Sequence, residues 1–314
     1  MAVDSARASS RGRMDHPALL YSSLPRFVDE VVPFVREGIE RGEPVVVAVG
    51  DSELAALRKE LGPDRPGMEL ADTRRWHPHP ASRLRAFHGI ALEAMEQGAR
   101  RVRLVGEPAW PTGPPEFVQE WERYESVLNR VLGPLPVTLI CTYDTTRTAP
   151  AILDHAQVTH PTVDGDPSAR YVRPDEVLAR WNDPLSDPPE DADLLERPAS
   201  LPEVRRFVRD AASRAGVAPD RVTDLCIAAN EVVTNAEIHG GEPITLRVWT
   251  DGDRFLCQVD DAGKRTIDPL AGYLPPSGRG DSGRGLWLAR QLVDLLQVVP
   301  RPGGTSVRLH VFRA

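Results

Sequence analysis

Four short stretches near the end of the chain decide its fold there: AANEVVTNAEIHG (Ala228–Gly240), DDAGKR (Asp260–Arg265), SGRGLWLARQL (Ser282–Leu292) and GGTSVRLHV (Gly303–Val311). In this order they supply an acidic residue and an asparagine one helical turn apart, an Asp-x-Gly turn, a Gly-x-Gly loop that opens a helix, and a Gly-Thr pair that starts a strand. Each stretch alone is weak evidence. Their combination in a fixed order predicts a pocket for ATP and magnesium.

A helix is predicted over residues 219–239, beginning at Pro219 and stopped by two glycines. Six apolar residues form one arc that is expected to pack on a sheet: Val222, Leu225, Cys226, Ala229, Val233 and Ala236. The opposite side carries Asp224, Ala228, Glu231 and Asn235. A carboxylate at Glu231 can orient or deprotonate an attacking hydroxyl, and the amide oxygen of Asn235 can bind Mg²⁺. A solvated polar face is the alternative if this pair is taken alone.

Two further stretches suit the base of a nucleotide. Asp261 ends a predicted strand and can accept a hydrogen bond from an exocyclic amine such as adenine N6, while Gly263 lets the backbone approach the ring. Thr305, at the start of the last strand, can hydrogen-bond near the base. A plain turn and simple β-propensity are the respective alternatives.

The phosphates are expected at a second helix start. Residues 265–280 are rich in proline and glycine, which is typical of a mobile lid over a ligand. Gly283 and Gly285 then open a helix whose free N–H groups suit phosphate binding, and Arg284 and Arg279 can add positive charge.

The remaining C-terminal sequence predicts an α+β sandwich with helices on one face. Ser200 is placed to cap a helix that begins at Leu201. Two predicted hairpins, over residues 244–261 and 296–312, carry turn signals at DGD and RPGG.

Upstream, buried strands alternate with helical patterns, which predicts an α/β domain with a mostly parallel sheet. The expected strands are residues 43–50, 101–110 and 136–144, and the expected helices are residues 51–62 (with Asp51 or Ser52 at its N-cap), 82–97 and 116–132. Ligands of such sheets bind beyond the carboxyl ends of the strands. These ends carry Gly50-Asp51, Gly106-Glu107 with Trp110, and Tyr143-Asp144.

Composition and length bound the class of protein. At 314 residues two domains are expected, and 41% hydrophobic with 27% charged residues is typical of a globular chain. The net charge of −8 gives no reason to expect direct nucleic-acid or membrane binding. We predict a disordered tail over residues 1–14, an N-terminal domain over 15–180, a proline-rich acidic linker over 181–193 and a C-terminal domain over 194–314. With no signal sequence or spanning run in view, a cytoplasmic location is expected.

Cysteine and histidine spacing favours no metal centre. Cys141, Cys226 and Cys257 lie far apart in apolar runs, and we interpret them as buried free thiols. His77, His79, His155 and His160 have no cysteine placed to complete a site, so structural histidines are the better interpretation. A Cys141 nucleophile is weaker still, because its strand reads as core.

The C-terminal stretches resemble the N, G1, G2 and late Gly-Thr boxes of the GHKL (histidine kinase-like) ATPase superfamily. NEVVTNAEIHG and GRGLWLARQLVD are most similar to the anti-sigma factor serine/threonine kinases, over about residues 194–312. The resemblance implies Glu231 as general base, Asn235 as Mg²⁺ ligand, Asp261 as adenine contact, and Gly283 and Gly285 as phosphate loop. One departure is Arg265, which stands where the second glycine of DxGxG is usual.

The N-terminal part more faintly resembles the MEDS (DcmR-like) sensory domain. The resemblance rests on HPALLYSS, PFVREGIERGEPVVVAV, GEPAW, EWERYESVLN, ICTYD and VTHP, over about residues 15–174. It implies a sensing role, with a small-molecule ligand as a candidate partner and no established chemistry.

The favoured hypothesis is a cytoplasmic bacterial anti-sigma factor with serine/threonine kinase activity, using ATP and Mg²⁺. Its partners would be a sigma factor and an anti-anti-sigma (STAS-type) protein, and related kinases suggest a homodimer. The alternatives are a soluble sensor histidine kinase, a nucleotide-gated binding protein without kinase activity, and a metabolic enzyme of the α/β domain. Arg265 is the best support for the nucleotide-gated binding protein. A histidine kinase is disfavoured because the linker is broken by prolines and contains no histidine.

Overall fold

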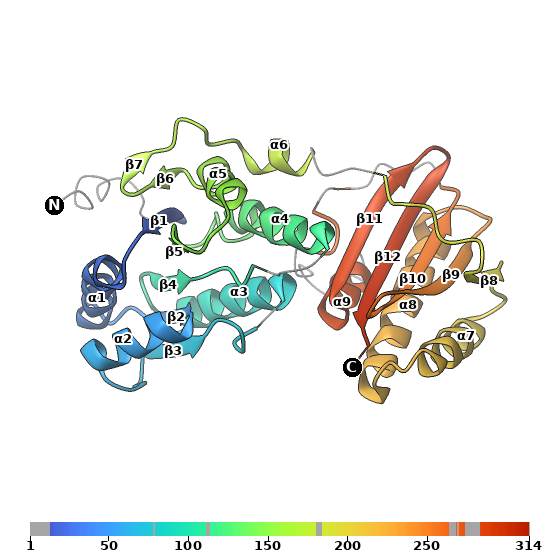
Figure 1. Cartoon of the computed structure of the whole chain (residues 1–314), viewed down its shortest axis with the longest axis horizontal. Helices are drawn as coiled ribbons and strands as arrows, with labels where there is room; N and C mark the ends of the chain where they lie inside the picture. Colours follow the sequence, from blue (N-terminus) through green and yellow to red (C-terminus); the bar gives the residue numbers. More distant parts are fainter. Residues whose placement is uncertain are drawn as a thin grey trace. The chain divides into compact units, whose positions relative to one another are not determined.

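The computed structural model describes residues 13–77, 79–110, 114–179, 184–263, 268, 270–273 and 283–313. The chain forms two compact units, residues 1–177 and 178–314 (Figure 1). Of the predicted tail, residues 1–12 lie outside the described residues. Met14 donates its backbone N–H to the carbonyl of Gly133, at 3.2 Å. The domain limits drawn from the sequence stay predictions.

The N-terminal unit is built on a seven-stranded sheet in the order β3-β2-β4-β5-β1-β6-β7. Every neighbouring pair is parallel except β6 with β7, which confirms the predicted mostly parallel α/β fold. The strands are β1 (Pro17–Tyr21), β2 (Val45–Val49), β3 (Met68–Asp72), β4 (Val102–Gly106), β5 (Val137–Asp144), β6 (Thr162–Val163) and β7 (Asp166–Pro167). The sequence of β2, VVVAV, is buried throughout, as befits a central strand covered on both faces.

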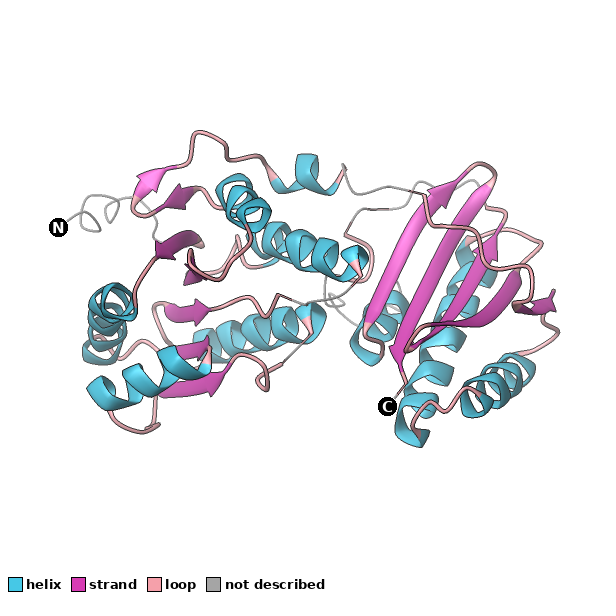
Figure 2. Ribbon diagram, viewed as in Figure 1, coloured by secondary structure: helices cyan, strands magenta, loops and turns pink. Residues whose placement is uncertain are grey.

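The helices of this region are α1 (Leu24–Glu40), α2 (Asp51–Leu61), α3 (Pro80–Glu96), α4 (Pro115–Val131), α5 (Pro150–Thr159) and α6 (Pro174–Leu178) (Figure 2). Helices α1 and α2 pack together on β2 and β3 around Phe27, Val31 and Leu57. The predicted N-cap of α2 was wrong: Gly50 is the N-cap, and Asp51 lies in the first turn. An acidic residue there is favourable without capping, because it faces the positive end of the helix dipole.

The C-terminal unit is built on a five-stranded antiparallel sheet in the order β11-β12-β10-β9-β8. Its strands are β8 (Asp193–Glu196), β9 (Thr245–Asp251), β10 (Arg254–Asp261), β11 (Leu295–Arg301) and β12 (Gly304–Phe312). Its helices are α7 (Leu201–Arg214), α8 (Pro219–His239) and α9 (Arg284–Leu292), all on the same side of the sheet in Figure 1. The predicted α+β sandwich is confirmed.

Helix α8 spans the predicted residues, and its predicted apolar arc is buried in the core against the sheet. Ala228, which we placed on the polar side, is fully buried. The reason is that α9 packs against α8. The side of α8 opposite the sheet is therefore partly covered by protein rather than by water.

The opposite face of this sheet is polar but largely buried. Arg308 donates to both the hydroxyl and the carbonyl oxygen of Ser186, in the segment that precedes β8. Arg308 also donates to Gln258, and Ser306 donates to Asp260. The described part of the predicted linker is thus held on the sheet through Ser186, although most of its residues are exposed.

Candidate functional site

Helix α8 presents the two residues that the sequence singled out. Glu231 and Asn235 are half-buried and lie one turn apart. The helix forms here because Pro219 fixes the backbone of its first turn and a continuous apolar arc anchors it on the sheet. Their spacing along this helix makes the two side chains neighbours, as predicted.

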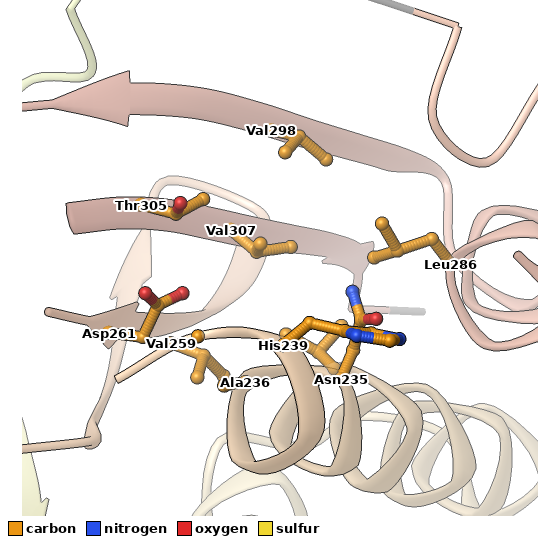
Figure 3. A pocket seen from close by; sticks show the side chains of 11 residues that line it. Asn235, Ala236, His239, Val259, Asp261, Leu286, Val298, Thr305 and Val307 are labelled. Carbon is orange, nitrogen blue, oxygen red and sulfur yellow. The ribbon is translucent and has the colours of Figure 1, made fainter. Parts of the chain in front are cut away.

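A pocket lies between α8 and the strands β10, β11 and β12 (Figure 3). It is lined by Val232, Asn235, Ala236, His239, Gly240, Val259, Asp261, Leu286, Val298, Thr305 and Val307. Three predicted site residues are among them: Asn235, Asp261 and Thr305. In Figure 3 Asp261 and Thr305 lie at one end of the pocket, and Asn235 lies toward the other, near Leu286.

Asp261 and Thr305 are brought together by the pairing of their strands. They are direct partners in the register of β10 and β12, and both are buried. Oδ1 of Asp261 accepts the backbone N–H of Gly263 at 2.8 Å, which fixes the carboxylate at the end of the strand. A buried acceptor at the end of a pocket with valine walls can recognise a ligand that offers an N–H group.

The start of α9 lies against Glu231. Gly283 is the N-cap residue with φ 89°, a left-handed conformation that glycine adopts without strain. A Cβ added at Gly285 would stand 2.9 Å from Oε2 of Glu231, so a larger residue there would displace this carboxylate. Arg284, which stands between Gly283 and Gly285 in the sequence, is exposed. The N–H groups at this helix start suit an anion, and they lie next to a carboxylate on α8.

Part of the predicted site falls outside the described residues, namely Arg265, Arg279 and most of the predicted lid. Within the lid, Leu270 and Tyr273 are described and buried. The guanidinium of Arg290, on α9, lies 3.8 Å from the ring centroid of Tyr273. Tyr273 of the predicted lid is therefore packed on α9.

Sequence reasoning missed the apolar walls of the pocket and His239. Val259 and Val307 were recognised only as strand residues, and His239 only as the end of α8. Strand alternation could have found the two valines, because Val259 lies two residues before Asp261 and Val307 two after Thr305. His239 lines the pocket because of where the end of α8 meets the sheet. The sequence contains no signal for that meeting point.

Residues at the carboxyl ends of the parallel strands in the N-terminal unit contact one another. Glu107 accepts the N–H of Gly50 at 2.6 Å, and burial raises the pKa of Glu107. Arg147 binds both Asp144 and Glu53, at 2.5 and 2.8 Å, although neither Arg147 nor Glu53 was predicted. These groups pair among themselves.

None of the helices in the described part of the chain has the length and apolarity that a membrane crossing requires.

Comparison with known proteins gives each unit a family. Residues 15–161 match the MEDS family, the methanogen/methylotroph, DcmR sensory domain. Residues 194–311 match the histidine kinase-like ATPase domain. No curated protein matches the chain.

Several solved structures resemble part of this chain. One contains the RsbU and RsbW domains of Rv1364c from Mycobacterium tuberculosis, with 22% identity, a TM-score of 0.28, and coverage of 38% of this chain and 32% of that one. Another is the histidine kinase domain of a blue-light activated histidine kinase from Erythrobacter litoralis, with 18% identity, a TM-score of 0.27, and coverage of 36% and 59%. A third is the histidine kinase domain of the E. coli osmosensor EnvZ, with 22% identity, a TM-score of 0.25, and coverage of 39% and 89%.

This chain therefore spans about a third of the first of these proteins. Its own two units are identified by the family matches: an N-terminal MEDS domain is followed by a C-terminal domain of the histidine kinase-like (GHKL) ATPase family.

Proposed function

We propose that the C-terminal domain binds ATP in the pocket between α8 and the sheet and transfers its γ-phosphoryl group to a serine or threonine of a STAS-type anti-anti-sigma protein. Phosphate transfer takes place in one state of the chain, and in a second state the chain binds a sigma factor. The MEDS domain biases the choice between these two states. The observation that carries the proposal is the approach of Gly285 to Glu231, because it sets a helix start suited to phosphate beside a carboxylate.

Each residue along the pocket has its own role. Asp261 accepts a hydrogen bond from the adenine amine, with Gly263 and Thr305 beside the base, and the valines pack on the ring. The N–H groups near Gly283 and Gly285 bind the phosphates, and Arg284 adds charge. Glu231 takes the proton from the attacking hydroxyl while the new O–P bond forms. The bond between the γ-phosphorus and the β-phosphate oxygen breaks, and ADP leaves.

The site suits magnesium through Asn235. This amide is half-buried and lines the pocket toward the end that meets α9. An amide oxygen binds Mg²⁺ without adding negative charge near a triphosphate. Mg²⁺ held by Asn235 would neutralise negative charge on the phosphates during transfer.

A histidine kinase is the alternative within the same family. Such a kinase needs a phosphoacceptor histidine on a dimerising helical hairpin. Between α5 and α7 the described residues contain one helix, the five-residue α6, and the sequence from residue 161 to residue 200 contains no histidine. This favours a hydroxyl on a separate protein as the acceptor.

A nucleotide-gated binding protein without kinase activity is the second alternative. Its support is Arg265, which replaces the second glycine of the DxGxG motif. It predicts ATP binding without phosphate transfer.

The test uses the purified full chain with γ-labelled ATP, Mg²⁺ and purified STAS-type proteins of the organism that encodes it. Label on a STAS-type protein that survives acid and is lost in alkali, and that is absent with the Glu231→Gln variant, supports the proposal. Acid-labile label on the chain itself would favour a histidine kinase. ATP binding with no label on any tested protein or on the chain would favour the nucleotide-gated protein.

A further inference from the structure

A group of four side chains of the kinds that bind metals lies inside the MEDS domain. They come from four separate places in the fold: just before β1, on α4, on β5 and at the end of α5. All four are at most 3% exposed, and their ligand atoms all lie within 4.8 Å of one another. We propose that they bind one divalent transition-metal ion of the zinc class: His16, Glu125, Cys141 and His160.

Three of the six distances between the ligand atoms are close to those around a four-coordinate ion, and the other three are at most 4.8 Å. Nε2 of His16 lies 3.2 Å from Sγ of Cys141 and 3.7 Å from Oε2 of Glu125. Nε2 of His160 lies 3.4 Å from the same oxygen. Tetrahedral zinc with bonds of about 2.0–2.3 Å separates its ligand atoms by roughly 3.3–3.8 Å. The side chains therefore need little movement to coordinate an ion.

The outer nitrogen of each histidine is held by a hydrogen bond that turns the inner nitrogen toward the group. Nδ1 of His160 lies 2.8 Å from the carbonyl oxygen of Ala156, which can only accept, so Nδ1 carries the proton. Nδ1 of His16 lies 3.1 Å from Oδ1 of Asn129.

The orientation of Asn129 is fixed in turn. Its amide nitrogen donates to the carbonyl of Thr159 at 2.8 Å, so its oxygen faces His16 as an acceptor. In the neutral tautomers that these hydrogen bonds select, both imidazoles present an unprotonated Nε2 to the interior. A metal-binding histidine typically has this arrangement, with the second nitrogen bonded to a carbonyl or amide oxygen.

The carboxylate of Glu125 gives an independent reason for a cation. It is fully buried, and no hydrogen bond among the described residues satisfies either of its oxygens or Nε2 of His160. The nearby buried Arg83 donates to the backbone carbonyls of Thr73 and Glu107 instead. A buried carboxylate without a hydrogen bond is costly, and a metal ion coordinated by Glu125 and His160 removes that cost.

The donor set selects the kind of ion. Two imidazoles and a thiolate favour zinc and its neighbours in the first transition row over Mg²⁺ or Ca²⁺, which prefer oxygen ligands. On binding, the Cys141 thiol loses its proton to solvent and a sulfur–metal bond forms. Four protein ligands close the coordination shell, so the ion ties β1, β5, α4 and α5 together.

The first test measures the metal content of the full chain purified without chelator and its binding after the metal has been removed. We expect about one zinc ion per chain, a higher Tm with zinc than without, and a cobalt-loaded form with tetrahedral visible absorption and a sulfur-to-cobalt charge-transfer band. A metal-stripped, folded chain that takes up neither zinc nor cobalt would overturn the proposal. So would a cobalt spectrum without the sulfur band.

Variants then assign the ligands. Cys141→Ser is expected to lose the charge-transfer band, whereas Cys257→Ser, equally buried in the other domain, keeps it. Asn129→Ala removes no ligand and is expected to lower zinc affinity about 10- to 100-fold by releasing His16. Unchanged zinc affinity in a folded Asn129→Ala chain would contradict the orientation argued for His16. If Cys141→Ser does not fold, the wild-type cobalt spectrum still decides whether sulfur binds.

Discussion

Gly285 approaches Glu231 so closely that no larger residue fits without movement: a Cβ on the glycine would stand 2.9 Å from Oε2 of the carboxylate. Gly285→Ala is therefore expected to displace the Glu231 side chain and to lower phosphate transfer at least 10-fold, a fraction of the roughly 10²–10⁴-fold that a general base contributes. Labelled transfer to the STAS-type protein measures the effect.

The matched control for this variant is Gly89→Ala. Gly89 lies inside α3, and a Cβ there would meet nothing within 4 Å. This substitution is expected to leave transfer unchanged and to stabilise the chain by about 0.5–1 kcal/mol, as alanine does within helices. Equal activity of the two variants would show that the approach to Glu231 has no part in the reaction.

Glu231→Gln tests the proposed base directly. The amide is of nearly the same size but cannot take a proton from a hydroxyl, so transfer is expected to fall by roughly 10²–10⁴-fold while ATP affinity stays nearly constant. Glu237→Gln, an exposed position on the same helix, is the control. Transfer retained by the Glu231 variant would remove this residue as the base.

Asn235→Ala tests the proposed magnesium ligand. We expect the affinity for ATP to fall about 10-fold in the presence of Mg²⁺, which corresponds to about 1.4 kcal/mol. Without Mg²⁺, in EDTA, wild type and variant are expected to bind ATP alike. A loss of equal size in both conditions would mean that the asparagine acts on the nucleotide or the fold, and not through the metal.

His310, on β12, makes the stability of the C-terminal domain depend on pH. Burial, followed by the charges of Arg254 and Arg308, lowers the pKa of His310 to about 3. The folded chain keeps this imidazole neutral, whereas the unfolded chain protonates it near pH 6.5. The stabilisation of the folded state by neutral His310 is therefore complete above about pH 6.5. It is lost progressively as the pH falls toward 3.

Urea unfolding of the full chain at pH 7 and pH 5 measures this effect. A folded-state pKa of about 3 predicts that wild type loses about 2 kcal/mol more than His310→Gln between these two values, because each pKa unit is worth about 1.36 kcal/mol. Groups shared by the two chains cancel in this comparison. Parallel pH curves for the two proteins would contradict a folded-state pKa of about 3 for His310.

Helix α8 and the hairpins could be predicted from the sequence because their signals are local. Proline at the first turn, an apolar arc of helical period and the Asp-Gly turn of β9 and β10 each act within a few residues. The same holds for β2, whose apolar run needs burial on both faces.

Features that depend on distant partners were missed. The short strands β1 and β3 were not predicted, because they are defined by parallel pairing with β5 and β2 rather than by their own pattern. We placed Ala228 on the polar side of α8 because the sequence of α8 does not indicate where α9 packs. Our expectation that no cysteine lies near the four histidines considered was wrong for His160, whose ligand nitrogen lies within 4.8 Å of Sγ of Cys141. His16, which we did not consider, lies 3.2 Å from the same sulfur although 125 residues separate the two along the chain.

Calorimetric titration of the full chain with a non-hydrolysable ATP analogue and Mg²⁺, in parallel with the matching GTP analogue, decides whether the pocket is an adenine nucleotide site. We expect one ATP site per chain and much weaker GTP binding, because the Asp261 carboxylate accepts from the adenine amine but faces an acceptor oxygen on guanine. The Asp261→Ala variant is expected to lose this preference. No ATP binding by the folded wild-type chain, or equal binding of ATP and GTP, would contradict the account.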